Sequence, residues 1–181
     1  MASFDNVTSA IASQLLAGDI FLLTYSGHGS QLIDQDGDES DGLDETWCLY
    51  DGQIVDDELY QIWTKFRAGV RIIVVSDSCH SGTVIRSHSP QLETVISKDI
   101  TCSASGILLS GCRDNQFSYD APSNGAFTAQ LLKVWNNGQF KGSHKKFLQA
   151  ISSGLPKRQR PCYLTFGAKN IKFSRQNPFQ P

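Results

Sequence analysis

No aspartate or glutamate occurs after residue 120 in this chain of 181 residues. Residues 1–120 hold all 18 acids and 6 of the 16 basic residues, a formal charge of −12, and residues 121–181 carry +10. Eleven of the acids fall between Asp34 and Glu58. Such polarity is typical either of an acidic site with a basic tail or of two solvated faces that attract each other.

Long apolar runs and paired cysteines are also missing. No run approaches the ~18–20 apolar residues of a membrane helix, and the first residues lack the basic and apolar regions of a signal peptide. The 5 cysteines form no C-x-x-C pair, which argues against a disulfide or zinc framework and favours a reduced, cytoplasmic protein. The basic residues have no interleaved stacking aromatics, so no nucleic-acid partner is expected.

Four short apolar runs have the length and β-branched content of buried strands. These runs are Asp19–Tyr25, Arg71–Asp77, Gly106–Cys112 and Cys162–Gly167. Helix-like stretches lie between them, at Asn6–Ala17, Asp56–Phe66, Asn124–Trp135 and Ser143–Ser152. The first stretch is predicted to be amphipathic, with Val7, Ile11, Leu15 and Leu16 on one face. Alternating strands and helices predict an α/β layer built on a mostly parallel sheet.

Two of these strands end in small residues around one reactive side chain. The first opens into YSGHGS with His28, and the second into SDSCHSG with Cys79. Ligands of parallel sheets bind beyond the carboxyl ends of the strands, so we expect both side chains at one edge. A histidine near neutral pKa can deprotonate a thiol. We therefore predict that Cys79 is a nucleophile, that His28 is its base, and that the N–H groups of Gly29 and Cys79 stabilise an oxyanion.

Asp77 and Ser26 are the predicted substrate-binding residues. Asp77 precedes Cys79 by two positions, and Ser26 precedes His28 in the same way, so the members of each pair point to the same side of an extended strand. A carboxylate beside the nucleophile would bind a guanidinium and disfavour an acidic substrate residue. The alternative is that Asp77 caps the turn that follows it.

The motifs YSGHGS and DSCHSG resemble the His and Cys motifs of metacaspases and bacterial orthocaspases, the relatives of caspases. The segments DGLDETWCLYDGQIVDDEL, LSGCRDNQFSYD, NGAFT and QNPF agree with that family as well. The resemblance implies a three-layer α/β/α caspase-hemoglobinase fold. It implies one domain over 1–181, with a large-subunit-like part at 1–85 and a small-subunit-like part at 106–181. It also implies cysteine endopeptidase activity after Arg or Lys through a thioester, with Cys79 as nucleophile and His28 as base and acid.

A calcium site is a further implication of the resemblance. By alignment its acids are Asp44, Asp56 and Asp57, and the family site uses another acid seven residues after the catalytic cysteine. This sequence has Arg86 there, and a cation would repel calcium. We therefore expect that no cofactor is required. The alternative for these acids is a solvated loop followed by a helix N-terminus.

The chain departs from the family at its start. Family domains have a strand and a turn with a second pocket acid before the segment that corresponds to Phe4–Val7. The fold is therefore expected without its first strand and with an open sheet edge. The alternatives are a fragment or naturally short variant, weaker binding of basic substrate residues, completion by another chain, self-association, or a non-catalytic caspase-like interaction module.

Two further expectations concern the region after the catalytic motif and the remaining histidines. Arg86 and Lys98 lie in a polar stretch where family members cut themselves, so self-cleavage is a hypothesis. His88 and His144 lie in polar sequence and are expected at the surface.

Overall fold

The computed structural model describes residues 3–34, 42–78, 101–111 and 125–180. Within these ranges helices and strands alternate along the chain. In order they are α1 (Phe4–Gln14), β1 (Ile20–Ser26), β2 (Gly29–Ile33), β3 (Leu43–Leu49), β4 (Gly52–Val55), α2 (Asp56–Thr64), β5 (Arg71–Asp77), β6 (Ser105–Ser110), α3 (Ala126–Trp135), a short 3-10 turn (Asn136–Gly138), α4 (His144–Ser153), β7 (Cys162–Gly167) and α5 (Ile171–Arg175).

The central sheet contains the four strands that the sequence predicts. Its order is β1-β5-β6-β7. The β1–β5 and β5–β6 pairs are parallel and the β6–β7 pair is antiparallel. All six residues of β6 are buried, as a strand covered on both faces requires. The expected mostly parallel sheet is confirmed.

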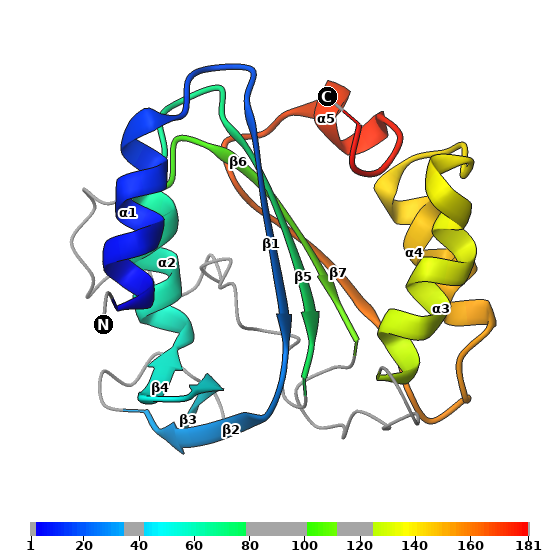
Figure 1. Cartoon of the computed structure of the whole chain (residues 1–181), viewed down its shortest axis with the longest axis horizontal. Coiled ribbons are helices and arrows are strands. Elements are labelled where there is room, and N and C mark those ends of the chain that lie inside the picture. The colour runs from blue at the N-terminus through cyan, green and yellow to red at the C-terminus, as the bar shows by residue number, and fades with distance from the viewer. Residues whose placement is uncertain (1–2, 35–41, 79–100, 112–124, 181) are drawn as a thin grey trace.

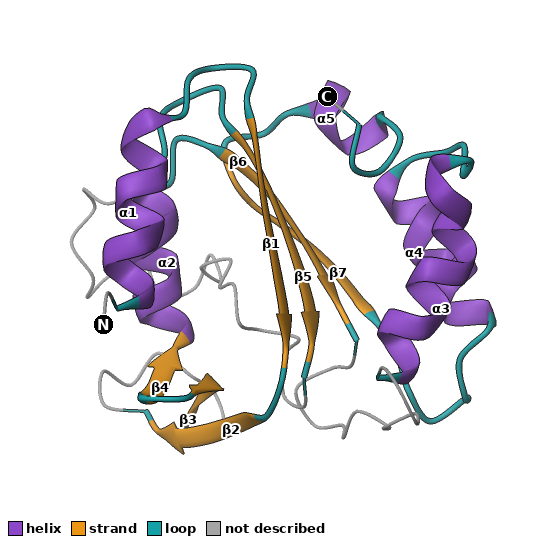
Figure 2. Ribbon diagram, in the orientation of Figure 1, coloured by secondary structure: helices purple, strands orange, loops and turns teal. Residues whose placement is uncertain are grey.

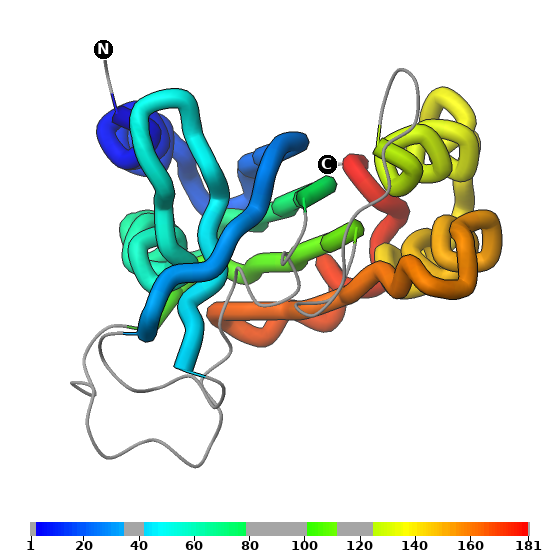
Figure 3. Tube along the Cα trace, turned by 90° about the horizontal axis from the view of Figure 1, so that it is seen from below, coloured from blue at the N-terminus to red at the C-terminus, as the bar shows by residue number. Residues whose placement is uncertain are grey.

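Helices cover both faces of this sheet, as Figures 1 and 2 show. On one side, α1 and α2 lie against it, and α3 and α4 lie on the other (Figure 3). Alternation along β5 explains the two layers, because Ile72 and Val74 belong to the core under α1 and α2, whereas Ile73 and Val75 belong to the core under α3 and α4. The three-layer α/β/α arrangement is therefore present. None of the described helices is long and apolar enough to cross a membrane.

Strand β1 forms one edge of the central sheet. Among the described strands it pairs only with β5. The side chain of Leu22 in its middle is 48% exposed, although leucine is a typical core residue. The open sheet edge expected from the sequence thus exists in the described part of the chain.

Helix α1 corrects one sequence prediction. The helix ends at Gln14, and the side chains of Val7, Ile11 and Leu16 are exposed instead of buried. Of the four predicted residues only Leu15, just after the helix, packs against the core. Its buried positions are Thr8 and Ala12, one turn apart. These small side chains face the neighbouring core, so the helix packs through a different face from the one its apolar periodicity indicates.

A small antiparallel sheet, β2-β3-β4, was not predicted from the sequence. It follows directly from β1, and residues 27 and 28 connect β1 to β2. Strand β3 contains Asp44, Glu45 and Thr46, all buried, so it lacks the apolar pattern of a core strand. This sheet lies beyond the carboxyl end of β1 and fixes the segment that carries His28 (Figure 1).

Candidate active site

The parallel register of β1 and β5 sets the geometry of the candidate site. Ser26 lies opposite Asp77, and each is the last residue of its strand. The N–H of Gly27 donates to the carbonyl oxygen of Asp77 at 3.3 Å, which joins the two strand ends. His28 follows Ser26 by two residues, and Cys79 follows Asp77 by two. Cys79 itself lies outside the described residues, so its approach to His28 remains a prediction.

The backbone at His28 is held by two donors. The N–H of Cys48 in β3 donates to the carbonyl oxygen of His28 at 2.9 Å. The hydroxyl of Tyr25 donates to the same oxygen at 2.7 Å. The imidazole belongs to an exposed residue, so a substrate can reach it. The sequence therefore folds into a fixed turn with an accessible histidine at its tip.

Tyr25 is itself fixed by packing. Its ring stacks on Trp47 with centroids 4.5 Å apart and planes 15° apart, and Trp47 is 1% exposed. The Tyr25 hydroxyl also lies 2.9 Å from the carbonyl oxygen of Cys48, so its one proton is shared between the carbonyls of His28 and Cys48. Burial raises the pKa of Tyr25 to about 12, so the hydroxyl stays protonated and acts as a donor at neutral pH.

Gly29, the predicted oxyanion residue, is the first residue of β2 and lies opposite Trp47. The adjacent pair in the ladder, His28 and Cys48, is joined by the hydrogen bond from the Cys48 N–H to the His28 carbonyl oxygen. Hydrogen-bonded and non-hydrogen-bonded pairs alternate along an antiparallel ladder, so Gly29 and Trp47 form a non-hydrogen-bonded pair. The N–H of Gly29 therefore points away from β3, as an oxyanion donor would need to.

Asp77 has a defined partner in the second half of the chain. It is 5% exposed, and its Oδ2 accepts the N–H of Thr128 at 3.0 Å and the hydroxyl of Thr128 at 2.6 Å. Thr128 lies in the first turn of α3, which begins after Gly125. The carboxylate thus caps a helix 51 residues away along the sequence. The turn that Asp77 was alternatively expected to cap lies outside the described residues.

The other residues of the strand ends differ in accessibility. Ser26 is exposed, and its contact with substrate stays a prediction. Ser76 and Ser78 are buried, and their hydroxyl oxygens lie 3.1 Å apart. The β5 end is therefore a packed polar layer and the β1 end is open to solvent.

The acids assigned to a calcium site lie partly inside the protein. Asp44 in β3 is 7% exposed, so it does not belong to a solvated loop. Asp56, which is 0% exposed, and Asp57 lie in the first turn of α2, as the helix N-terminus of the alternative requires. Asp56 Oδ1 accepts the N–H of Asp57 at 3.2 Å. Across the described ranges, no three His, Cys, Asp or Glu side chains are grouped so that they could hold a metal. Arg86 lies outside those ranges, and the calcium site stays a prediction.

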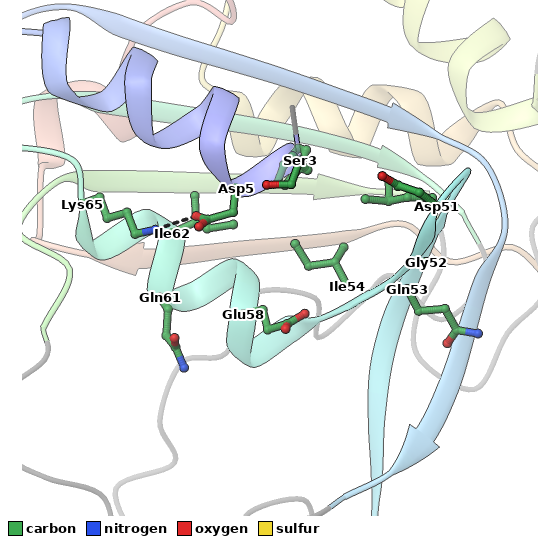
Figure 4. Close-up of a pocket in the computed structure, with 12 residues that line it drawn as sticks. Ser3, Asp5, Asp51, Gly52, Gln53, Ile54, Glu58, Gln61, Ile62 and Lys65 are labelled. Carbon is green, nitrogen blue, oxygen red and sulfur yellow. Dashed lines mark hydrogen bonds and ion pairs between the residues drawn. The ribbon is translucent and has the colours of Figure 1, made fainter. Parts of the chain in front are cut away.

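A separate pocket of about 300 Å³ lies where the start of α1 meets the β3–β4 turn and α2 (Figure 4). Lys65 and Asp5 on its wall form an ion pair of 2.5 Å, and the Lys65 hydrogen bond lowers the pKa of Asp5. The lining includes none of the predicted catalytic or substrate-binding residues. It is therefore distinct from the candidate active site.

Sequence reasoning missed the residues that support the site. Tyr25 belongs to the YSGHGS motif and Thr128 to the NGAFT motif, so both segments were noticed without a role for these side chains. Trp47 belongs to the segment DGLDETWCLYDGQIVDDEL, which was likewise noticed without a role for this side chain. The hypothetical self-cleavage positions Arg86 and Lys98 lie outside the described residues.

Known proteins match this chain in sequence and in structure. Residues 4–88 match the family described as "Metacaspase, peptidase C14 domain". Metacaspase-1 of Saccharomyces cerevisiae is 49% identical over 161 residues, which cover 84% of this chain and 34% of the relative. Metacaspase-1 of Arabidopsis thaliana is 35% identical over 156 residues, which cover 75% of this chain and 39% of the relative. The chain thus spans little more than a third of these curated relatives.

Two solved structures share the architecture. A crystal structure of a Geobacter sulfurreducens protein has a TM-score of 0.80 and 45% identity, with 97% of this chain and 76% of the other covered. Caspase-1 of Spodoptera frugiperda has a TM-score of 0.58 at 11% identity, with 90% and 66% covered. The second likeness bears on the fold alone, and the caspase-like α/β fold with a mostly parallel sheet is confirmed. The sequence matches, together with this shared fold, show that the chain belongs to the metacaspase family of caspase-like C14 peptidases.

Proposed function

We propose that this chain is a cysteine endopeptidase that cleaves polypeptides after Arg or Lys. The observation that carries the proposal is the register of β1 and β5, because it aligns the strand ends that precede His28 and Cys79. The metacaspase relatives support the reaction class. A thiol nucleophile also suits a reducing compartment such as the cytoplasm, which we include in the proposal.

The reaction is acyl transfer. His28 takes the proton of the Cys79 thiol, and the thiolate forms a bond to the carbonyl carbon of the scissile peptide. The N–H of Gly29, which points away from β3, stabilises the oxyanion together with the N–H of Cys79. Collapse of the intermediate breaks the C–N bond, and His28 gives its proton to the leaving amine. Water then attacks the thioester, its proton passes through His28 to the sulfur, and the carboxylic acid leaves.

Charge supports the preference for basic substrates. Asp77 ends the strand that leads to Cys79, and its carboxylate can pair with a guanidinium or an ammonium group. The −12 formal charge of residues 1–120 attracts basic peptides over a longer range. The +10 part includes α3, α4 and β7, which complete the fold, so it needs no nucleic acid to explain it.

One observation favours a second candidate function. The edge of β1 has no partner strand besides β5 in the described part of the chain, and Leu22 is half exposed there. A strand from another polypeptide could pair with such an edge. The alternative is therefore a non-catalytic caspase-like module, or a half-domain completed by another chain.

Fluorogenic peptides that end in Arg, Lys or Asp distinguish these functions. We expect turnover of the Arg and Lys peptides, none of the Asp peptide, and none by Cys79→Ala. Calcium and a chelator are compared in parallel, and equal rates are expected because no cofactor is required in this proposal. Absence of Arg and Lys cleavage by the wild type would favour the module, and equal turnover by Cys79→Ala would overturn the assigned nucleophile.

A further inference from the structure

We propose that Thr128 is a positioning residue for substrate recognition, because it orients the Asp77 carboxylate toward the basic side chain of the substrate. This inference rests on the proposed Arg/Lys specificity and deepens it. It concerns the contact between the second half of the chain and the end of β5. Thr128 itself is not proposed to touch the substrate.

Two hydrogen bonds from one residue fix the carboxylate. The backbone N–H of Thr128 is 3.0 Å from Asp77 Oδ2, and its hydroxyl is 2.6 Å from the same oxygen. The N–H is one of the first-turn donors of α3 that has no partner within the helix. The positive end of the helix dipole adds to the attraction. A carboxylate held in this way has one preferred rotamer.

Two glycines leave room for this carboxylate. A Cβ atom built on Gly125 would collide with Asp77 Oδ2, and one built on Gly111 would lie 3.1 Å from Oδ1. Gly125 has φ −53° and ψ 148°, a conformation open to any residue, so space and not backbone strain requires glycine there. Any side chain at position 125 would displace the carboxylate.

The orientation of the Asp77 carboxylate matters more for binding an arginine side chain than for binding a lysine side chain. A guanidinium pairs with a carboxylate through two parallel hydrogen bonds in one plane, whereas an ammonium acts as a point charge. Recognition sites need their groups within about 0.5 Å and 10–20° of the productive geometry. A carboxylate that rotates after loss of the Thr128 hydroxyl should therefore lose affinity for Arg before it loses affinity for Lys.

The test measures kcat and KM for matched Arg and Lys peptides. In Thr128→Val the hydroxyl is replaced by a methyl group of similar size, and Thr128→Ser keeps the hydroxyl. We expect Thr128→Val to lower kcat/KM for the Arg peptide on the order of 10-fold, mainly through KM, and to lower it less for the Lys peptide. Thr128→Ser should restore the wild-type ratio. Thr64→Val, which removes a hydroxyl bonded to the Gln61 carbonyl in α2, is the matched control and should keep that ratio.

Gly125→Ala tests the same carboxylate by a steric contact with Oδ2 and remains informative if Thr128→Val does not fold. It should lower the Arg-to-Lys ratio in the same direction. An unchanged ratio in the folded variants, with active wild-type protein, would overturn the role of Thr128 and leave the proposed function intact. A wild type that cleaves neither peptide would overturn both.

Discussion

The hydroxyl of Tyr25 lies 2.7 Å from the carbonyl oxygen of His28, three residues further along the chain. The same carbonyl accepts the N–H of Cys48 from β3. The turn that carries His28, the proposed general base, is therefore hydrogen-bonded both to β1 and to the small β2-β3-β4 sheet. Because Tyr25 is stacked on buried Trp47, the position of His28 depends on the packing of the core below it.

Tyr25→Phe should impair catalysis more than folding. Phenylalanine keeps the stacking on Trp47 but removes the hydroxyl that holds the His28 carbonyl. A lost neutral hydrogen bond corresponds to about 1 kcal/mol, or roughly a fivefold fall in kcat/KM if it acts only on the position of the base. Peptidase kinetics and urea unfolding of the same preparation measure the two effects.

Tyr50→Phe is the matched control, because Tyr50 is 99% exposed. It should leave both kinetics and stability unchanged. If Tyr25→Phe also had wild-type kcat and KM, the hydroxyl would have no part in positioning His28.

Gly27→Ala should disturb the same turn through a steric contact. A Cβ at this position would lie 2.7 Å from the Tyr25 hydroxyl oxygen, closer than van der Waals contact allows. We expect a lower kcat/KM that is partly restored in the double variant with Tyr25→Phe, since the hydroxyl is then absent. A double-mutant cycle measures this coupling, and strictly additive effects would contradict it.

The central strands were predictable because each is a short apolar run, and β5 and β6 are buried on both faces. The bounds of β5 and β7 agree with the sequence prediction residue for residue. The β2–β4 sheet escaped prediction because Asp44 and Glu45 are buried in it, and acids usually indicate a surface loop. The face of α1 was predicted wrongly because Thr8 and Ala12, together with Phe4, meet the core, whereas Val7 and Ile11 are exposed.

The site residues were predictable where small residues surround a reactive side chain at a strand end, as with His28. Contacts between the two halves of the chain leave no such local signal. Asp77 and Thr128 meet only because α3 starts at the end of β5, 51 residues later in the sequence. His144 was expected at the surface from its polar neighbours, yet it is fully buried at the start of α4, with its ring edge-on to Phe173 of α5 at 5.4 Å.

The burial of His144 predicts that the folded protein loses stability in mild acid. Burial lowers its pKa to about 4 from the ordinary 6.5. The unfolded chain therefore binds a proton at this residue between these values, whereas the folded protein does not, so stability falls as pH drops below 6.5. The expected loss in the free energy of unfolding between pH 7.5 and pH 5 is about 2 kcal/mol from this group.

His144→Phe removes the titrating group and keeps an aromatic ring beside Phe173. Urea unfolding of the wild type and the variant at pH 7.5 and pH 5 isolates the contribution of His144 to stability, because the other titrating groups are the same in the two proteins. The free energy of unfolding should differ less between pH 7.5 and pH 5 in the variant than in the wild type. The same pH dependence in variant and wild type would rule out His144 as its source.

Asp77→Asn separates substrate binding from helix capping. Asparagine can still accept the two Thr128 hydrogen bonds through its amide oxygen, so the cap on α3 is largely kept and the cost in stability should be about 1 kcal/mol. The negative charge is lost, and we expect kcat/KM for both Arg and Lys peptides to fall on the order of 100-fold. Asp51→Asn removes an exposed acid from the β3–β4 turn and serves as the control for net charge. If Asp77→Asn kept wild-type cleavage while its unfolding midpoint fell, Asp77 would be a structural cap, and the basic specificity would have to come from other residues.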